Sequence, residues 1–302
     1  MSSAIVFSSD NAVSSTPPYY QFSYQFPSNV SFENKQIAVQ AIIVPYSWPN
    51  VSGVPFIPNY NNNQFTYLWS DGSTGTVNLG ESGYYDVNTL NLALDYQMIQ
   101  NNQYTVNSSN GTFNYYLSFE ANPVDYAVQI NAIPVPTSTG AAALGIVQPT
   151  GASWSWPTQP TTPQIVIPAT GPANMTNTSF STLVGFNPGT YPPSATGVGY
   201  SVISQFTPDF NPVSSVIMLC SAVNNKYAFQ NNVMYAINAQ GVNYGDYITL
   251  YPPQLNWLEC TRGQASSMTI TFIDQNLKNL VPLLDPTITV ILTIRDTPKS
   301  ER

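Results

Sequence analysis

Histidine is absent from this chain of 302 residues, and ionic groups are scarce. Aspartate, glutamate, lysine and arginine make up 7% of the sequence, whereas they make up roughly a quarter of an average globular protein. Without histidine the chain has no Ser-His-Asp triad, no imidazole base near neutral pH and no histidine-ligated metal. The sequence therefore predicts a protein without catalytic residues of these classes, without a bound metal and without a cofactor.

Basic residues are almost missing from the first three quarters of the chain. Up to Asn225 there are nine acidic residues and one basic residue, Lys35. Binding to nucleic-acid phosphates requires a basic surface, so we expect no specific nucleic-acid partner. No apolar run reaches the roughly 18 residues that a membrane span needs, and the N-terminus lacks the basic and apolar regions of a signal peptide. These features predict synthesis in a reducing cytosol.

Cys220 and Cys260 are the only cysteines, and each lies beside a strand-like run. In a cytosolic protein this favours two buried thiols that act as small hydrophobic side chains. Their separation along the chain also permits a disulfide between them, so the sequence leaves both states open.

Proline, tyrosine and phenylalanine are abundant, with 26, 20 and 14 copies, and this composition favours short strands joined by turns. Apolar residues alternate with polar ones at both ends of the chain, in residues 20–26, 37–43, 268–272 and 288–294. We expect Pro27 to close the first of these strands. In the middle, Asp86 is suited to cap a helix whose Leu90, Leu94 and Met98 form one apolar stripe.

Strands at both ends around a mixed middle block predict a single jelly-roll β-sandwich with two facing four-stranded sheets. In a jelly roll, sheets form from strands that are far apart in sequence. The predicted jelly-roll domain comprises residues 1–79 and 193–302. Residues 80–192 are predicted to be an inserted, mostly β module containing one helix, because a long insertion in one connection costs little loop entropy. The segment before Tyr19 is expected either to fray or to lie on a neighbouring molecule.

A series of short sequence elements runs through nearly the whole chain. It consists of Phe26-Pro27, residues 35–39, 43–50, 83–86, 183–186, 189–192, 212–215, 245–252, Trp257, residues 270–275 and Asp285. In order and spacing the series resembles the penton (minor capsid) proteins of virophages and polinton-like viruses.

This resemblance implies a non-enzymatic virion protein that forms homopentamers at the five-fold vertices of an icosahedral capsid. Its neighbours there would be trimers of a double-jelly-roll major capsid protein. The resemblance further implies that the insertion faces outward, and that the protein is made in the host cytoplasm. The composition suits a shell subunit, because protein interfaces are enriched in aromatic residues and depleted of lysine and glutamate.

Six residues are interpreted as contacts between subunits: Trp48, Asn50, Trp154, Trp156, Arg262 and Asp274. The tryptophans lie in proline-flanked segments that make rigid anchors, and the two charged residues lie near strand ends. Solvated loop charges are the alternative for Arg262 and Asp274. For Trp154 and Trp156 the alternative is a sugar-stacking platform, which would make the protein a carbohydrate- or receptor-binding β-sandwich.

Acidic residues offer the remaining routes to chemistry. Glu120 and Asp125 flank one hairpin turn, and a glycosidase needs two carboxyl groups roughly 5–9 Å apart. Solvated turn residues are the simpler interpretation of this pair. Asp71, Glu81 and Asp86 do not have the spacing of an EF-hand calcium loop.

Overall fold

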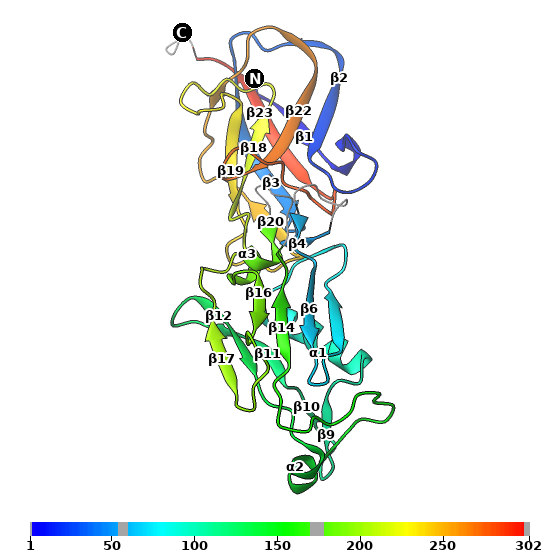
Figure 1. Cartoon of the computed structure of the whole chain (residues 1–302). Helices are drawn as coiled ribbons and strands as arrows, with labels where there is room; N and C mark the ends of the chain where they lie inside the picture. The colour runs from blue at the N-terminus through cyan, green and yellow to red at the C-terminus, as the bar shows by residue number, and fades with distance from the viewer. Residues whose placement is uncertain (1, 54–59, 170–177, 299–302) are drawn as a thin grey trace. The chain divides into compact units, whose positions relative to one another are not determined.

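The computed structural model describes residues 2–53, 60–169 and 178–298. The chain divides into two compact units. The first consists of Met1–Pro49 and Val213–Arg302, and the second of Asn50–Pro212. Figure 1 shows that the chain enters the second unit after the first few strands and returns to the first unit near residue 213.

Two antiparallel sheets form the first unit. One has the order β1 (Ser2–Phe7), β23 (Thr289–Asp296), β3 (Lys35–Pro45) and β20 (Tyr247–Leu250), with the short β21 (Leu258–Glu259) also paired to β3. The other has the order β19 (Val233–Asn238), β18 (Ser215–Cys220), β22 (Gln264–Asp274) and β2 (Gln21–Ser31). The rings of Phe7 and Tyr24, one from each sheet, meet with their centroids 6.1 Å apart.

The strand order of these sheets is that of a jelly roll. Counted along the chain, the eight main strands give the orders 1-8-3-6 and 5-4-7-2, so each sheet combines strands from both ends of the sequence. Phe22, Phe272 and Leu292 are fully buried in the core. The predicted fold class, a single jelly-roll sandwich of two four-stranded sheets, is confirmed.

The N-terminal segment is part of this sandwich rather than a frayed end or an arm on another molecule. Strand β1 pairs with β23 along its whole length, from Ser2 opposite Arg295 to Phe7 opposite Val290. Ile5 and Phe7 are buried. These two residues alone cannot stabilise a strand, but the long β23 supplies a complete row of hydrogen-bond partners.

Pro27 does not close its strand as expected, because β2 continues to Ser31. The pairing of β2 with β22 is interrupted between Gln25 and Val30, and Pro27 lies inside this interruption. Since β2 is an outer strand, a residue without an N–H is tolerated there at no cost in sheet hydrogen bonds.

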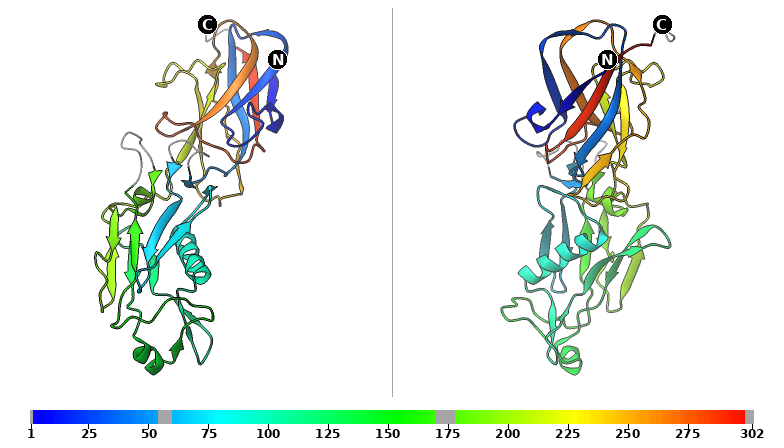
Figure 2. Two further views of the ribbon diagram at one scale, coloured as in Figure 1. Left: turned by 45° about the vertical axis from the view of Figure 1, so that its right-hand side comes forward. Right: turned by 180° about the vertical axis from the view of Figure 1, so that it is seen from behind.

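Within its described residues, the second unit consists of several small sheets and the helices α1 (Val87–Gln100), α2 (Ser138–Ala143) and α3 (Phe180–Val184) (Figure 2). Its largest sheets are β16 (Gly189–Tyr191), β14 (Gln164–Ile167), β6 (Gln64–Leu68) and β7 (Thr74–Asn78), and β11 (Leu117–Asn122), β12 (Ala127–Ala132) and β17 (Tyr200–Ile203). The smaller ones are β9 (Thr105–Asn107), β10 (Phe113–Asn114) and β13 (Ile146–Val147), β4 (Val51–Ser52) with β8 (Ser82–Gly83), and β5 (Tyr60–Asn61) with β15 (Thr178–Ser179).

The boundaries of this unit differ from those predicted. Residues 50–79 and 193–212, expected in the jelly roll, belong to the second unit. Strand β6 pairs with β14 and β7, and Phe65 of β6 stacks on Phe180, with ring centroids 4.6 Å apart. The alternation of Phe65, Tyr67 and Trp69 therefore correctly indicates a strand, but alternation does not specify which sheet a strand joins.

Helix α1 forms as predicted. The carboxylate of Asp86 accepts the N–H of Thr89 at 2.7 Å, and Leu90, Leu94 and Met98 are fully buried. The second unit also contains α2 and α3, whereas the sequence predicts a single helix for the inserted module. Gly185 ends α3 with a φ of 74°, which a glycine adopts without steric cost.

We expect Asp86→Ala to lower the free energy of unfolding by about 1 kcal/mol, the usual contribution of an N-cap. The hydrogen bond from the Thr89 N–H holds the pKa of Asp86 below its ordinary value. A carboxyl whose pKa is lowered by folding stabilises above its unfolded pKa, and this contribution is lost as the pH falls through the folded pKa. The difference in free energy of unfolding between Asp86→Ala and the unaltered chain should therefore become smaller in acid. Urea denaturation at several pH values measures this difference. Asp86→Asn, which also caps well, is the matched control and should be nearly neutral at pH 7.

Both cysteines are free and buried, so the prediction of two buried thiols is confirmed. Burial raises the pKa of Cys220 to about 12, and burial together with the nearby Cys220 raises the pKa of Cys260 to about 12. Neither thiol is therefore ionised near neutral pH. Because the thiolate is the reactive form of cysteine, both side chains are unreactive there.

Candidate assembly surface

The outer strands β19 and β20 give one side of the jelly roll two unpaired strand edges. Within the described residues, β19 pairs only with β18, and β20 pairs only with β3. Neither strand contains proline or a charged residue. Outer strands in monomeric proteins are usually protected by lysine, proline or a covering segment. This side of the jelly roll lacks the first two of these protections.

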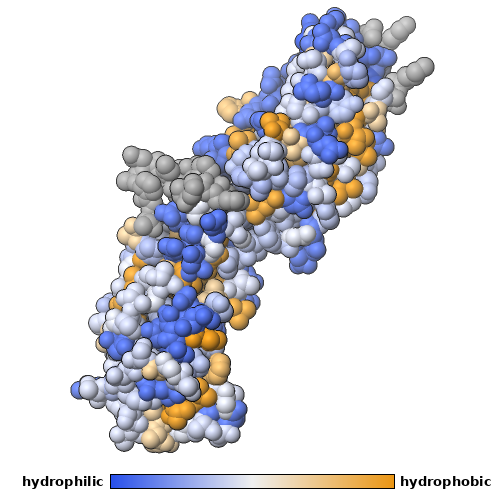
Figure 3. All heavy atoms as spheres, turned by 90° about the vertical axis from the view of Figure 1, so that its right-hand side faces the viewer, coloured by the Kyte–Doolittle hydropathy of each residue, from blue (hydrophilic) through white to orange (hydrophobic). Residues whose placement is uncertain are grey.

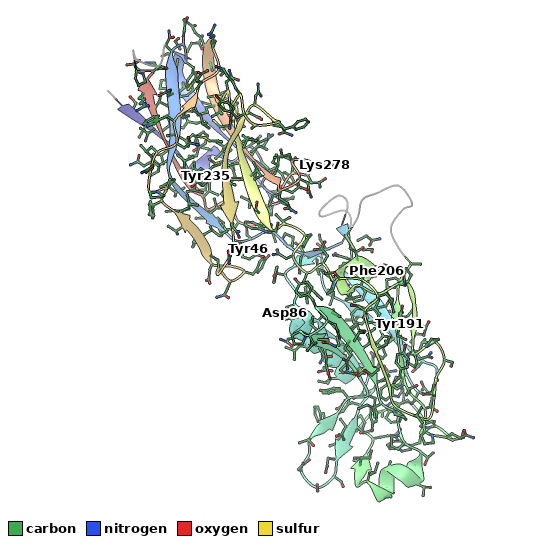
Figure 4. The ribbon with its side chains drawn as sticks, turned by 90° about the vertical axis from the view of Figure 1, so that its left-hand side faces the viewer. Tyr46, Asp86, Tyr191, Phe206, Tyr235 and Lys278 are labelled. Carbon is green, nitrogen blue, oxygen red and sulfur yellow. The ribbon has the colours of Figure 1, made fainter. Side chains whose placement is uncertain are left out.

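Aromatic side chains follow the same side of the molecule. We call Tyr227, Phe229, Tyr235, Tyr244, Tyr247 and Tyr251 the aromatic edge; all but the half-buried Tyr235 are exposed. Figure 4 views the chain from this side and places Tyr235 on β19. Between Lys226 and Glu259 the sequence has a single charged residue, Asp246. Aromatic enrichment with few charges is the composition of protein interfaces.

The loop before β19 holds two of these aromatic residues in an ordered conformation. The amide side chain of Asn225 accepts the N–H of Tyr227 at 3.1 Å and donates to the carbonyl of Val233 at 3.2 Å. The ammonium of Lys226 lies 2.7 Å from Glu259. Tyr227 and Phe229 are nonetheless fully exposed. The backbone of the loop is therefore anchored at Asn225 and Tyr227, which reduces the backbone entropy that the loop loses when it binds.

The opposite side of the jelly roll, formed by β1 and β2, has a different surface. Figure 3 views this side and shows small apolar groups interspersed with polar ones. Val6 of β1 and Val13 are exposed there. Ala12 and Val13 pair with Phe22 and Gln21 on the outer edge of β2, so this side offers apolar side chains rather than a continuous row of free backbone groups.

Two of the predicted contact residues are buried within the chain. Asn50 donates to the carbonyls of Tyr85 and Phe210, at 2.6 and 2.8 Å, and accepts the N–H of Tyr85 at 2.8 Å. Trp48 is buried with its ring 4.5 Å from that of Tyr46. The interpretation of Trp48 and Asn50 as contacts to another subunit is therefore corrected, because neither side chain reaches the surface.

Trp154 and Trp156 belong to the second unit and do not form an open platform. Trp154 is buried, donates its indole N–H to the carbonyl of Asn102 and packs edge-on against Trp69 at 5.4 Å. Trp156 is half-buried and lies edge-on to Trp154, with a centroid distance of 5.1 Å. The pair fills the core of the second unit, so Trp154 is not a subunit contact and the pair offers no sugar-stacking face.

The two charged candidates have different surroundings. Asp274 is buried, and its Oδ1 accepts the backbone N–H groups of Asn276, Lys278 and Asn279 at 3.0–3.3 Å. It therefore organises the turn after β22 instead of contacting a neighbour. Arg262 lies between β21 and β22, and it is the one member of the predicted set that is exposed.

Lys35, which has no partner nearby in the sequence, forms an ion pair with Asp296 across the β3–β23 ladder, with 2.7 Å between the charged atoms. Like the Lys226–Glu259 pair, it is partly exposed to solvent. Pairs of this kind typically contribute less than about 1 kcal/mol, so they neutralise charge more than they stabilise the fold.

The acidic residues considered for chemistry are ordinary turn residues. Glu120 and Asp125 are exposed on the β11–β12 hairpin, where they accept hydrogen bonds from Ser118 and Asn122 of the same hairpin. Within residues 2–53, 60–169 and 178–298, no three Asp, Glu or Cys side chains gather closely enough to hold a metal ion.

The strand order and the insertion define the class: a single jelly-roll β-sandwich with a large unit inserted between its third and fourth strands. No protein-family model matches the chain, and no curated protein matches its sequence.

Two solved structures are similar to this chain. The crystal structure of the selenomethionine-labelled mavirus penton protein is 9% identical, covers 97% of each chain and has a TM-score of 0.41. A chain of the Sputnik virophage structure determined by cryo-electron microscopy is 10% identical, covers 100% of this chain and 99% of that one, and has a TM-score of 0.39. Both similar structures come from virophages, and one of them is a penton protein, the kind of protein that the sequence resembles. The jelly-roll assignment rests on the strand order alone.

None of the helices in the described part of the chain combines the length and the apolar character needed to cross a membrane.

Proposed function

We propose that this chain is a structural virion protein, a penton subunit that forms homopentamers and closes the five-fold vertices of an icosahedral capsid. The observation that carries the proposal is the aromatic edge, together with β19 and β20, two uncharged strands whose outer edges have no partner strand among the described residues. The resemblance of the sequence to penton proteins is the reason for proposing a ring of five subunits.

A closed ring requires two different surfaces on each subunit, because each copy contacts its two neighbours head to tail. The aromatic edge of one copy is proposed to pack on the β1–β2 side of the next, where Val6 and Val13 are exposed. The tyrosine rings would bury apolar area while their hydroxyls keep hydrogen-bond partners. The scarcity of charge along this edge keeps the cost of desolvation low.

The same proposal places trimers of a double-jelly-roll major capsid protein around the pentamer and the inserted unit on its outer surface. The protein would act in the virion after synthesis in the host cytoplasm. It would act by assembly alone, without an enzymatic activity, cofactor or metal. The exposed, solvated positions of Glu120 and Asp125 support this, since a glycosidase acid is usually held in a low-polarity pocket.

The proposal predicts the mass of the purified full-length chain in solution. We expect light scattering to give five times the 33.0 kDa of one chain, and negative-stain electron microscopy to show five-fold rings. A chain that stays monomeric at every concentration tested, or that forms dimers with two-fold symmetry, contradicts the proposal.

The alternative function, a carbohydrate- or receptor-binding module, loses the Trp154–Trp156 platform on which it was based. A different feature of the second unit, the pocket beside α1, favours sugar binding as an additional property of the same protein.

A further inference from the structure

The second unit contains a pocket of about 190 Å³ beside helix α1. Asn91 and Asp95 of α1 form one wall, and residues 115–118 with Asn131 and Ile133 form the rest. Six of these eight residues carry side-chain oxygen or nitrogen atoms; Leu117 and Ile133 are the apolar ones. In ligand sites the placed polar groups fix the orientation of the ligand and give specificity.

The carboxylate of Asp95 is incompletely hydrogen-bonded. Its Oδ1 is closed off from solvent and has no hydrogen-bond partner among the described residues. In the described part of the chain, its Oδ2 accepts one long hydrogen bond, 3.3 Å from the amide nitrogen of Asn91. The sequence from residue 50 to residue 212 contains no lysine, arginine or histidine, so the unit has no basic side chain of its own to pair with this carboxylate. A carboxylate oxygen that is shielded from water and has no donor is costly, and a ligand that donates a hydrogen bond to the carboxylate removes that cost.

The neighbouring polar groups are held in place by the fold. The oxygen of Asn91 accepts the backbone N–H of Phe119 at 2.9 Å, which fixes the orientation of its amide. The oxygen of Asn131 accepts from Gln129 and Ser201, both at 2.8 Å, and its amide nitrogen donates to Ser118 at 3.4 Å. The site is therefore preorganised, and its binding does not depend on ordering these side chains first.

We propose that this pocket binds a neutral sugar unit of a glycan, with sugar hydroxyls donating to the carboxylate of Asp95. Rotation of the carboxylate about its last bond, a torsion with a broad minimum, presents an oxygen to the ligand. Amide and hydroxyl groups around the carboxylate both donate and accept, which matches sugar hydroxyls; a simple cation would require acceptors only. Tyr115 and the exposed Ile133 supply apolar surface for the carbon face of the ring. This activity is independent of the proposed assembly.

The affinity of the pocket for sugar should decrease as the pH falls. Burial raises the pKa of Asp95 to about 6. The other titratable groups that line the pocket are Tyr115 and Tyr116, and burial raises the pKa of both above the usual value of 10. Only Asp95 therefore titrates between pH 5 and 8. Sugar affinity should be highest above pH 6 and should fall below it, because the protonated carboxyl accepts hydrogen bonds less strongly.

The test mixes the full-length chain with the methyl glycosides of glucose, galactose, mannose, fucose and N-acetylglucosamine. Saturation-transfer NMR detects binding, and calorimetry measures its affinity. At least one of these neutral sugars should bind, and Asp95→Asn should weaken its affinity by about tenfold or more, the loss of one charge-assisted hydrogen bond. Asp125→Asn, which removes an exposed carboxylate from the β11–β12 hairpin of the same unit, is the matched control and should bind as the unaltered chain does. Thermal unfolding of Asp95→Asn verifies that the variant is folded.

Three results would overturn this inference. The chain could bind none of the five glycosides, Asp95→Asn could bind a glycoside as tightly as the unaltered chain does, or the pocket could bind methylammonium and no sugar. None of them bears on the pentamer, which is measured separately by the mass of the chain in solution. A monomeric chain that binds sugar through Asp95 would support the pocket and contradict the proposed vertex role.

Discussion

Replacing Tyr247 and Tyr251 together by lysine is expected to give a folded monomer where the unaltered chain forms rings. The two side chains are 49% and 66% exposed in the isolated chain, so neither contributes much to its core. At a lateral contact, each lysine would place an unpaired charge in a desolvated interface. Lysine on an outer strand also blocks edge-to-edge pairing, which is how natural sheets avoid association. We expect a loss of roughly 2 kcal/mol or more at each interface, the value typical of an interface hot spot.

The mass in solution is the measurement, with circular dichroism to show that the jelly roll remains folded. Tyr96→Lys combined with Tyr126→Lys is the matched control, because these tyrosines are 63% and 73% exposed but belong to the second unit. The control should keep the full ring. Complete rings formed by the Tyr247/Tyr251 variant would show that the aromatic edge is not the contact, while leaving the pentamer itself intact.

Local patterns predicted local structure well. The alternating segments 268–272 and 288–294 form the long strands β22 and β23, and the stripe of Leu90, Leu94 and Met98 is the buried face of α1. Gly185 follows a short apolar run and ends α3, which is a common position for glycine. In these segments a few neighbouring residues determine the backbone conformation on their own.

Pairing between distant segments was much harder to predict. Strand β6 has the same alternation as the jelly-roll strands, yet Phe65 lies against Phe180 of the second unit, more than a hundred residues further along the chain. Strand β1 is too short to be recognised by its own apolar content and is defined by β23 at the other end of the sequence. A periodic pattern specifies which side of a strand is buried, whereas the partner strand depends on contacts that a single sequence does not reveal.

The candidate contact residues were misjudged for a related reason. Trp154 and Trp48 are large and aromatic, and this property suits a protein core as well as an interface. Composition alone does not distinguish the two environments. The available signal for the aromatic edge was the stretch between Lys226 and Glu259, which combines several tyrosines with a single charge. Exposure of those tyrosines became visible only once the outer positions of β19 and β20 were known.

A second large effect is expected from Gly185→Ala, which should lower the free energy of unfolding of the second unit by roughly 4 kcal/mol. Gly185 has a φ of 74°, and a left-handed conformation costs an ordinary residue about 1–2 kcal/mol. The added Cβ would also lie 2.2 Å from the carbonyl oxygen of Phe206, a backbone atom that cannot rotate away. The N–H of Phe206 donates to the carbonyl of Gly185 at 2.9 Å, so relieving the overlap breaks a hydrogen bond as well. Overpacking of this kind costs a further 1–3 kcal/mol or so.

Gly72→Ala separates these two contributions. Gly72 has a φ of 83° in the same unit, but no atom lies within 4 Å of the Cβ that alanine would add. The same change in the unfolded chain occurs in both variants, so its effect cancels between them. Urea denaturation followed by the fluorescence of the buried Trp69 and Trp154 should show a loss of only about 1–2 kcal/mol for Gly72→Ala, the conformational cost alone. Equal losses in the two variants would mean that the segment after α3 moves away from Phe206 without cost, and that this close backbone contact does not help to hold the inserted unit together.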